Sequence, residues 1–244
     1  MSESAARAGD NVAQVHSQLR EAILAGDIRP GEKTSQAELA RALGAGRTPL
    51  REAVRMLQSE GLVVAKPNRR VEIAKLSLDD VEQLYVARIA LESAAARITV
   101  VRLTAGDISE LEGLMAQMDH LAARGGGDVP PLFAERHRAF HQRFVGGAGE
   151  RISALVAGLF DHSERYRKIY GAASADYYER RRGEHRQMLD AAARGDADGL
   201  VQALTAHYLN TAKLVAAALD PQRTLARLQA VAAATAPGAP QGLE

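Results

Sequence analysis

Residues 35–61, SQAELARALGAGRTPLREAVRMLQSEG, contain two helix starts separated by a glycine-containing turn. Ser35, followed three residues later by Glu38, forms a capping-box pattern that predicts a helix beginning there. Thr48 suits an N-cap and Pro49 suits a first helical position, so they predict a second helix up to the closing glycine. Two short helices with a tight turn between them are typical of a helix-turn-helix motif.

The second of these helices carries a stripe of arginines. Arg47, Arg51 and Arg55 repeat every four residues, and one interpretation is a solvated helix face. A helix-turn-helix motif instead places the N-terminal end of its second helix in the major groove. There Arg47 and Arg51 would contact bases, since arginine is the usual partner of guanine. Arg55 and Thr48 would contact phosphate.

A basic hairpin is predicted after the two helices. The β-prone runs 62–65 and 71–74 flank a turn. Arg69 and Arg70 at its tip could reach the adjacent groove or the DNA backbone. A helix over 11–25 is predicted to precede the motif, because its apolar residues recur at helical spacing. Three helices followed by a basic hairpin are the element order of a winged helix-turn-helix domain.

The composition supports a DNA-binding surface on an otherwise neutral protein. The chain has 244 residues, a net charge of +1 and no cysteine, which excludes disulfides and thiolate chemistry. Between Arg29 and Lys75 there are ten basic and five acidic residues, so one region should attract phosphate. No apolar run approaches the roughly 20 residues that span a bilayer, and there is no signal-peptide pattern. We therefore expect a cytoplasmic protein.

The remainder of the chain reads as helices, and a mainly α fold is predicted with an all-α bundle of about six helices. The predicted helices cover residues 79–100, 105–124, 131–145, 150–170, 175–194 and 197–219. The predicted organisation is a disordered N-terminus (1–10), a winged helix-turn-helix domain (11–75), a linker (76–78), a helical effector-binding and dimerisation domain (79–220) and a flexible tail that could hold one short helix (221–244).

Four histidines in the helical part are candidate metal ligands. His137 and His141 lie four residues apart on one predicted helix, so they project from one face and could share a metal. His185 and His207 lie on the last two predicted helices, and a bundle core can bring all four together. The alternative is that each is an ordinary partly buried or surface histidine.

A metal-dependent hydrolase is a weak alternative for the same residues. His137 and His141 have the spacing of the zinc-protease motif, in which a glutamate follows the first histidine as general base. That position is Arg138 here. The sequence also has no nucleophile-elbow, phosphate-loop or dinucleotide-binding fingerprint, so no enzymatic activity is expected.

The N-terminal motifs resemble the DNA-binding domain of the GntR family of bacterial transcription regulators. The resemblance rests on Leu19-Arg20-Glu21-Ala22-Ile23-Leu24-x-Gly26, Pro30-Gly31, Glu38-Leu39-Ala40, Arg47-Thr48-Pro49-Leu50-Arg51-Glu52-Ala53, Glu60-Gly61-Leu62 and Pro67-Asn68-Arg69. Three positions depart from the family pattern. Ala37 replaces a common DNA-contacting arginine, Gly46 replaces a common serine, and Arg70 replaces the usual glycine of the wing.

The C-terminal motifs resemble the FCD effector domain of the FadR/VanR-type members of that family, and six helices suit the VanR-like variant. The resemblance rests on Arg88-x-x-Leu91-Glu92, Ala94-Ala95-Ala96, Phe140-His141, Glu184-His185 and His207-Tyr208-Leu209. Many such domains hold a divalent metal with one aspartate and three histidines. His141, His185 and His207 match the histidines, whereas His137 stands at the aspartate position. Imidazole-rich ligation favours zinc or nickel over magnesium or calcium.

The resemblance also implies a partner and a mechanism. A small carboxylate would bind beside the metal, with Arg88 as its ion-pair partner and Tyr85 and Asn210 in the pocket lining. A surface salt bridge with Glu92 is the alternative for Arg88. The expected protein is a homodimeric regulator, most often a repressor, that binds a palindromic double-stranded DNA operator and responds to the acid. A regulator that senses the metal itself is the second possibility.

Overall fold

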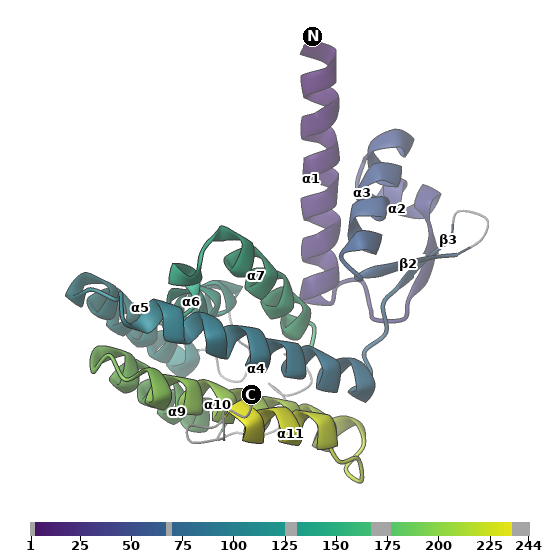
Figure 1. Ribbon diagram of the computed structural model, residues 1–244. Coiled ribbons are helices and arrows are strands. Elements are labelled where there is room, and N and C mark those ends of the chain that lie inside the picture. The colour runs from purple at the N-terminus through teal and green to yellow at the C-terminus, as the bar shows by residue number, and fades with distance from the viewer. Residues whose placement is uncertain (1–2, 67–69, 125–130, 167–176, 236–244) are drawn as a thin grey trace, which may run out of the picture. The chain divides into compact units, whose positions relative to one another are not determined.

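The computed structural model describes residues 3–66, 70–124, 131–166 and 177–235 (Figure 1). The chain divides into two compact units, Met1–Leu76 and Ser77–Glu244. The fold is mainly helical, as predicted, and each unit has its own hydrophobic core.

The N-terminal unit is a three-helix domain with a small antiparallel sheet. The strand order in the sheet is β1-β3-β2, and Val63 pairs with Ile73 in the hairpin. The elements are α1 (Glu3–Ala25), β1 (Lys33–Ser35), α2 (Gln36–Ala42), α3 (Arg47–Ser59), β2 (Val63–Lys66) and β3 (Arg70–Ile73). The predicted winged helix-turn-helix order is therefore confirmed, and β1 is an addition too short for the sequence to indicate.

The predicted helix starts of this unit are partly confirmed. Ser35 caps α2 with both halves of a capping box, because its side chain accepts from the backbone of Glu38 and the Glu38 carboxylate accepts from the backbone of Ser35. The first helix begins at Glu3 rather than near Asn11, so the N-terminus is helical where disorder was expected. The alanine-rich residues before Asn11 extend an already formed helix at little cost.

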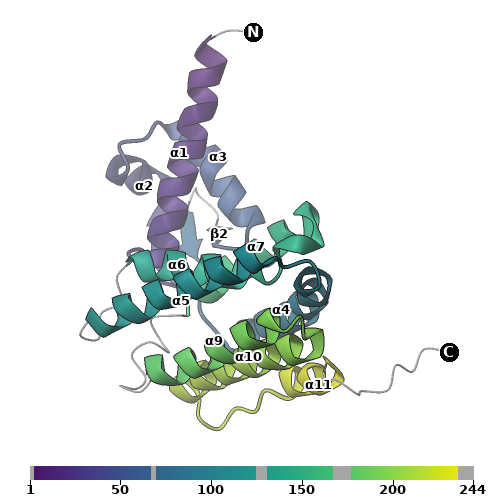
Figure 2. The ribbon, with the colours of Figure 1, turned by 90° about the vertical axis from the view of Figure 1, so that its left-hand side faces the viewer.

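The C-terminal unit is a helical bundle in which α4 is central. α4 packs against α7, α10 and α11, while α5 packs against α6 and α9 (Figure 2). The elements are α4 (Leu78–Val100), α5 (Ala105–Arg124), α6 (Pro131–Arg143), the 3-10 helix η1 (Gly146–Ala148), α7 (Glu150–Glu164), α9 (Tyr177–Ala193), α10 (Ala197–Leu219) and α11 (Ala226–Thr235). The helix predicted over 150–170 ends at Glu164, and residues 167–176 lie outside the described residues.

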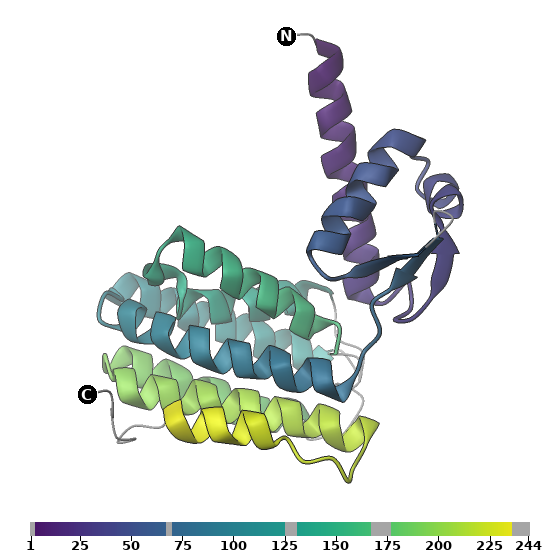
Figure 3. The ribbon, with the colours of Figure 1, turned by 45° about the vertical axis from the view of Figure 1, so that its right-hand side comes forward.

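The short helix that the sequence allowed in the tail is present as α11, and it is packed rather than flexible. α11 lies against α4 and α10 (Figure 3), and its Leu228 is fully buried. The carboxylate of Glu82 on α4 accepts from the backbone N–H and the Nε of Arg227, at 2.8 and 3.1 Å. An anion at a helix N-terminus satisfies unpaired N–H groups. The tail therefore belongs to the bundle through Thr235, because α4 supplies its cap and its apolar contact surface.

No helix within the described ranges is both long enough and apolar enough to cross a membrane.

Candidate functional site

The helix that carries the arginine stripe, α3, begins two residues earlier than the sequence suggested. Gly46 is its N-cap, with an extended backbone, and Arg47 is the first helical residue. Thr48 is therefore not the cap, and Pro49 is the third helical residue rather than the first. A proline is still tolerated there, because the N–H groups of the first helical turn have no partner within the helix.

The predicted DNA-contacting residues of α3 gather around one hollow. It has a volume of about 550 Å³ between the start of α2 and the exposed face of α3. Its lining residues are Ser35, Gln36, Ala37, Arg47, Thr48, Arg51, Val54, Arg55 and Gln58. The two glutamines were missed by the sequence reasoning, although glutamine is a common reader of adenine. The alanine at the position of the family's arginine leaves this hollow open.

The arginines of this surface are exposed and form only exposed ion pairs among the described residues. Arg51 and Arg55 each lie 3.3 Å from the carboxylate of Glu52, with more than half of each side chain exposed. Exposed ion pairs contribute little free energy, so phosphate or a base can replace Glu52 readily. Arg70 is exposed at the first position of β3, and Arg69 lies outside the described residues.

We expect Arg51→Ala to weaken specific DNA binding by about 1–3 kcal/mol, because a bidentate arginine–guanine contact is worth that much. The measurement is fluorescence anisotropy with a duplex that the wild-type protein has selected from a random library, beside an unrelated duplex. Arg97→Ala, an exposed arginine of the other unit, is the control. An equal loss on both duplexes would show that Arg51 contacts phosphate rather than a base.

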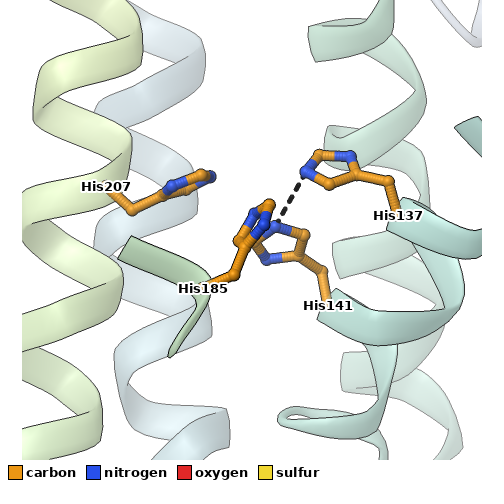
Figure 4. A group of neighbouring side chains, drawn as sticks. All are labelled: His137, His141, His185 and His207. Atoms are coloured by element: carbon orange, nitrogen blue, oxygen red, sulfur yellow. Dashed lines mark hydrogen bonds between the residues drawn. The ribbon is translucent and has the colours of Figure 1, made fainter. Parts of the chain in front are cut away.

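The four candidate metal ligands converge in the C-terminal unit. His137 and His141 come from α6, His185 from α9 and His207 from α10, and their rings point toward one another (Figure 4). One potential ligand atom from each lies within 4.8 Å of all the others. The Nε2 atoms of His137 and His141 are 3.1 Å apart, close to the spacing of about 3.3 Å that two imidazole nitrogens have around tetrahedral zinc.

Burial keeps three of the four imidazoles neutral. His141, His185 and His207 are each at most 5% exposed. Burial, together with nearby Arg181, lowers the pKa of His185 to about 3. Burial and the neighbouring imidazoles and arginines lower the pKa values of His141 and His207 well below the usual range. Neutral imidazole is the form that binds a metal ion.

Two buried nitrogens of the cluster have no hydrogen-bond partner among the described residues. They are Nδ1 of His141 and Nε2 of His185. Leaving a buried polar atom unpaired costs about 1–3 kcal/mol, and such atoms in a native structure call for an explanation. A nitrogen-ligated cation would satisfy the Nε2 of His185, so this donor set fits a borderline-soft divalent metal such as zinc or nickel.

Glu184 contacts the ring of His207 and fixes its orientation, a role that the sequence reasoning missed. Its Oε2 atom lies 2.8 Å from Nδ1 of His207 and accepts from Nη1 of Arg181 at 2.6 Å. An Nδ1–H donated to Glu184 leaves Nε2 of His207 as the ligand atom, the usual arrangement behind a metal-bound histidine. Asn210 is exposed and donates to the other oxygen of Glu184, so it contacts this support rather than the imidazoles.

Arg88 lies in a buried network beside the histidines. Its Nε donates to Glu92 at 2.7 Å and its Nη1 to Ser163 at 3.0 Å. The predicted salt bridge therefore exists, but it is in the core and not on the surface. Tyr208 donates to the second oxygen of Glu92 at 2.6 Å, and the guanidinium stacks 4.2 Å from its ring. Burial opposes the charge of Arg88, yet the combined interactions with Glu92, Tyr208 and Tyr85 outweigh burial and raise the pKa.

One nitrogen of this network remains available. Nη2 of Arg88 is buried and has no hydrogen-bond partner in the described part of the chain. Phe160 connects the network to the cluster, since its ring lies 5.3 Å from the guanidinium of Arg88 and 5.7 Å from the ring of His137. Tyr85 is buried beside Arg88, and burial raises its pKa to about 12. Arg88 and Tyr85 thus lie near the histidines, and the Nη2 group of Arg88 is unpaired among the described residues.

A helix-turn-helix unit with a basic hollow, followed by a helical bundle, defines a DNA-binding transcription regulator. The family models "Bacterial regulatory proteins, gntR family" and "FCD domain" match residues 11–73 and 83–210. The chain therefore belongs to the GntR family of bacterial transcription regulators and carries an FCD domain. The family and the relatives found are transcription regulators rather than enzymes. Arg138, at the position where a zinc protease has its general base, pairs with Asp161.

Individual relatives agree with this assignment. The transcriptional regulator YdhC of Bacillus subtilis is 26% identical over 80% of this chain and 86% of its own. A probable D-xylose utilization operon repressor of Paenarthrobacter nicotinovorans is 30% identical over 79% of this chain and 85% of its own. The structure of McbR/YncC of Escherichia coli has a TM-score of 0.70 at 20% identity, covering 82% of this chain and 94% of its own, which shows the shared fold.

Proposed function

We propose that this regulator represses transcription from a palindromic operator as a dimer, and that a small carboxylate bound beside a divalent metal changes its DNA affinity. The observation that supports the ligand site is the convergence of four histidines within 4.8 Å, three of them deeply buried. Dimers match palindromic operators because each DNA-reading unit contacts one half-site. One relative is a probable transcriptional repressor, which supports repression rather than activation by this protein.

The metal would be held by His137, His141, His185 and His207. Because all four ligands are neutral, the ion would keep its full positive charge and attract an anion. Nη2 of Arg88 supplies a second positive group in the same region, and arginine N–H groups bind carboxylate oxygens strongly. One metal-held oxygen and one contact to Arg88 would orient a small acid. Zinc or nickel suits the imidazole ligands.

The presence of four histidines, rather than three, also supports a second function, metal sensing. A tetrahedral ion that uses all four imidazoles has no open position, as in closed structural sites. The metal itself would then be the signal, and the protein would be a metal sensor. An acid-responsive site requires a fifth or sixth position, which nickel provides more readily than tetrahedral zinc, or the release of one histidine. His137 is the candidate for release, since it is the least buried of the four.

A titration separates the two functions. Metal-free protein and a selected operator duplex are mixed while anisotropy is recorded, first with zinc or nickel alone and then with citrate, lactate or succinate added. The proposed function predicts that DNA affinity changes when an acid is added to metal-loaded protein, and that acids have no effect on metal-free protein. A response to metal alone, with no further response to any acid, would identify a metal sensor.

A further inference from the structure

The C-terminal end of α7 contacts the candidate metal centre and the Arg88 network at the same time. The ring centroid of Phe160 lies 5.7 Å from that of His137 and 6.0 Å from that of His141. One turn later, the hydroxyl of Ser163 accepts from Nη1 of Arg88 at 3.0 Å. Both residues are buried, so a change in the imidazoles or in Arg88 must be accommodated by this part of α7.

Tyr166 connects the same turn to the start of the C-terminal unit. Its side chain is completely buried, and its hydroxyl accepts from the backbone N–H of Ser77 at 3.2 Å and donates to Asp80 at 2.5 Å. Ser77 is the N-cap of α4 and accepts from the backbone of Asp80. It is also the first residue of the C-terminal unit, directly following Leu76 of the DNA-binding unit.

Two hydrogen bonds join Phe160 to Ser163 and Ser163 to Tyr166. Ser163 donates its hydroxyl to the carbonyl of Phe160 at 2.6 Å, and the backbone N–H of Tyr166 donates to the carbonyl of Ser163 at 3.0 Å. Burial and the hydrogen bond to Asp80 raise the pKa of Tyr166, so its phenol keeps its proton at neutral pH. These contacts form a continuous hydrogen-bonded path from Phe160 to the N-cap of α4.

We propose that Tyr166 is the positioning residue through which occupancy of the histidine centre reaches the N-cap of α4, and thereby the covalent connection to the DNA-binding unit. Filling the centre shifts the Phe160–Ser163 turn, and Tyr166 transmits that shift to Ser77 and Asp80. The inference rests on the proposed metal function for its trigger. The route itself depends only on contacts among these residues. In coupling of this kind, filling the centre makes one of two arrangements of the Phe160–Tyr166 segment more stable than the other.

Hydrogen–deuterium exchange on the full-length protein tests the route, with zinc chloride as the probe. In the wild type, zinc should slow exchange in peptides covering α6 and also in the peptide covering Ser77–Val81. In Tyr166→Phe, α6 should respond as before and the response at Ser77–Val81 should be lost. Thr99→Val is the matched control, since it also removes one buried hydroxyl hydrogen bond from the bundle, at the other end of α4, and should keep both responses.

The outcomes separate this inference from the proposed function. Zinc content measured on the same samples establishes whether the centre fills, and absence of zinc would overturn both proposals. Protection of α6 without protection of Ser77–Val81 in the wild type would overturn the route alone. A Tyr166→Phe protein with the full wild-type response would do the same. If Tyr166 were only a packing residue, its substitution would change exchange at Ser77 equally with and without zinc.

Discussion

His141→Ala is expected to reduce the bound metal from about one ion per chain to almost none. His141 is the most deeply buried of the four histidines and lies in the middle of the cluster. Its ring centroid is 4.6 Å from that of His137, 5.3 Å from that of His185 and 5.0 Å from that of His207. Its removal takes away one ligand and opens a space in the core. Mass spectrometry of metals, on untagged protein never exposed to chelator, measures the change.

The control for this experiment is His120→Ala. His120 is exposed on α5 and contacts Arg124, outside the cluster, so its loss should leave the metal content unchanged. Circular dichroism would verify that both variants keep their helices. Equal metal content in the wild type and His141→Ala would show that the ion binds elsewhere. A wild type that stays metal-free after reloading with zinc or nickel would reject the proposed centre and restrict the carboxylate to Arg88.

Glu92→Ala is expected to lower the free energy of unfolding of the C-terminal unit by about 3–5 kcal/mol, because it leaves the buried charge of Arg88 without its partner. Arg88 and Glu92 are 3% and 1% exposed, so water cannot replace the lost carboxylate. The hydroxyl of Tyr208 also loses its acceptor. Urea unfolding at a fixed protein concentration, followed by circular dichroism, measures the loss.

A double variant separates the cost of an unpaired charge from the cost of lost packing. Arg88→Met with Glu92→Gln removes both charges and keeps an acceptor for Tyr208, so it should unfold at a higher urea concentration than Glu92→Ala. Replacing a whole buried ion pair is often neutral, whereas breaking it is not. If the double variant were as unstable as Glu92→Ala, packing and not charge would dominate at this position. Its carboxylate response should still be lost, since Arg88 is absent.

Local sequence patterns determined the DNA-binding unit almost completely. The capping box at Ser35, the hairpin and the arginine stripe each depend on residues close together in the chain, so spacing alone predicts them. The predicted start of α3 was wrong by two residues, because the observed cap is Gly46. A glycine can cap a helix through its backbone, and side-chain patterns carry no sign of that choice.

The candidate metal centre could be predicted only in part. The four-residue spacing of His137 and His141 places both on one face of α6. His185 and His207 come from two other helices, and their spacing in the sequence could say only that a bundle core can bring them to the pair, an inference that resemblance to the FCD domain strengthened. The support from Glu184 and Arg181 had no signal in spacing. A carboxylate that contacts a histidine 23 residues away is positioned by the packing of α9 against α10.

Thus the sequence by itself determined the fold class, the order of elements and the types of residue that form each site, because these follow from local propensity, capping and periodicity. The tertiary structure alone decided that α11 packs on α4, that the Arg88–Glu92 pair lies in the core, and that Tyr166 reaches Ser77. Each of these depends on which side chains are buried when helices distant in sequence pack together. Burial is a property of packed elements, and no short stretch of sequence contains it.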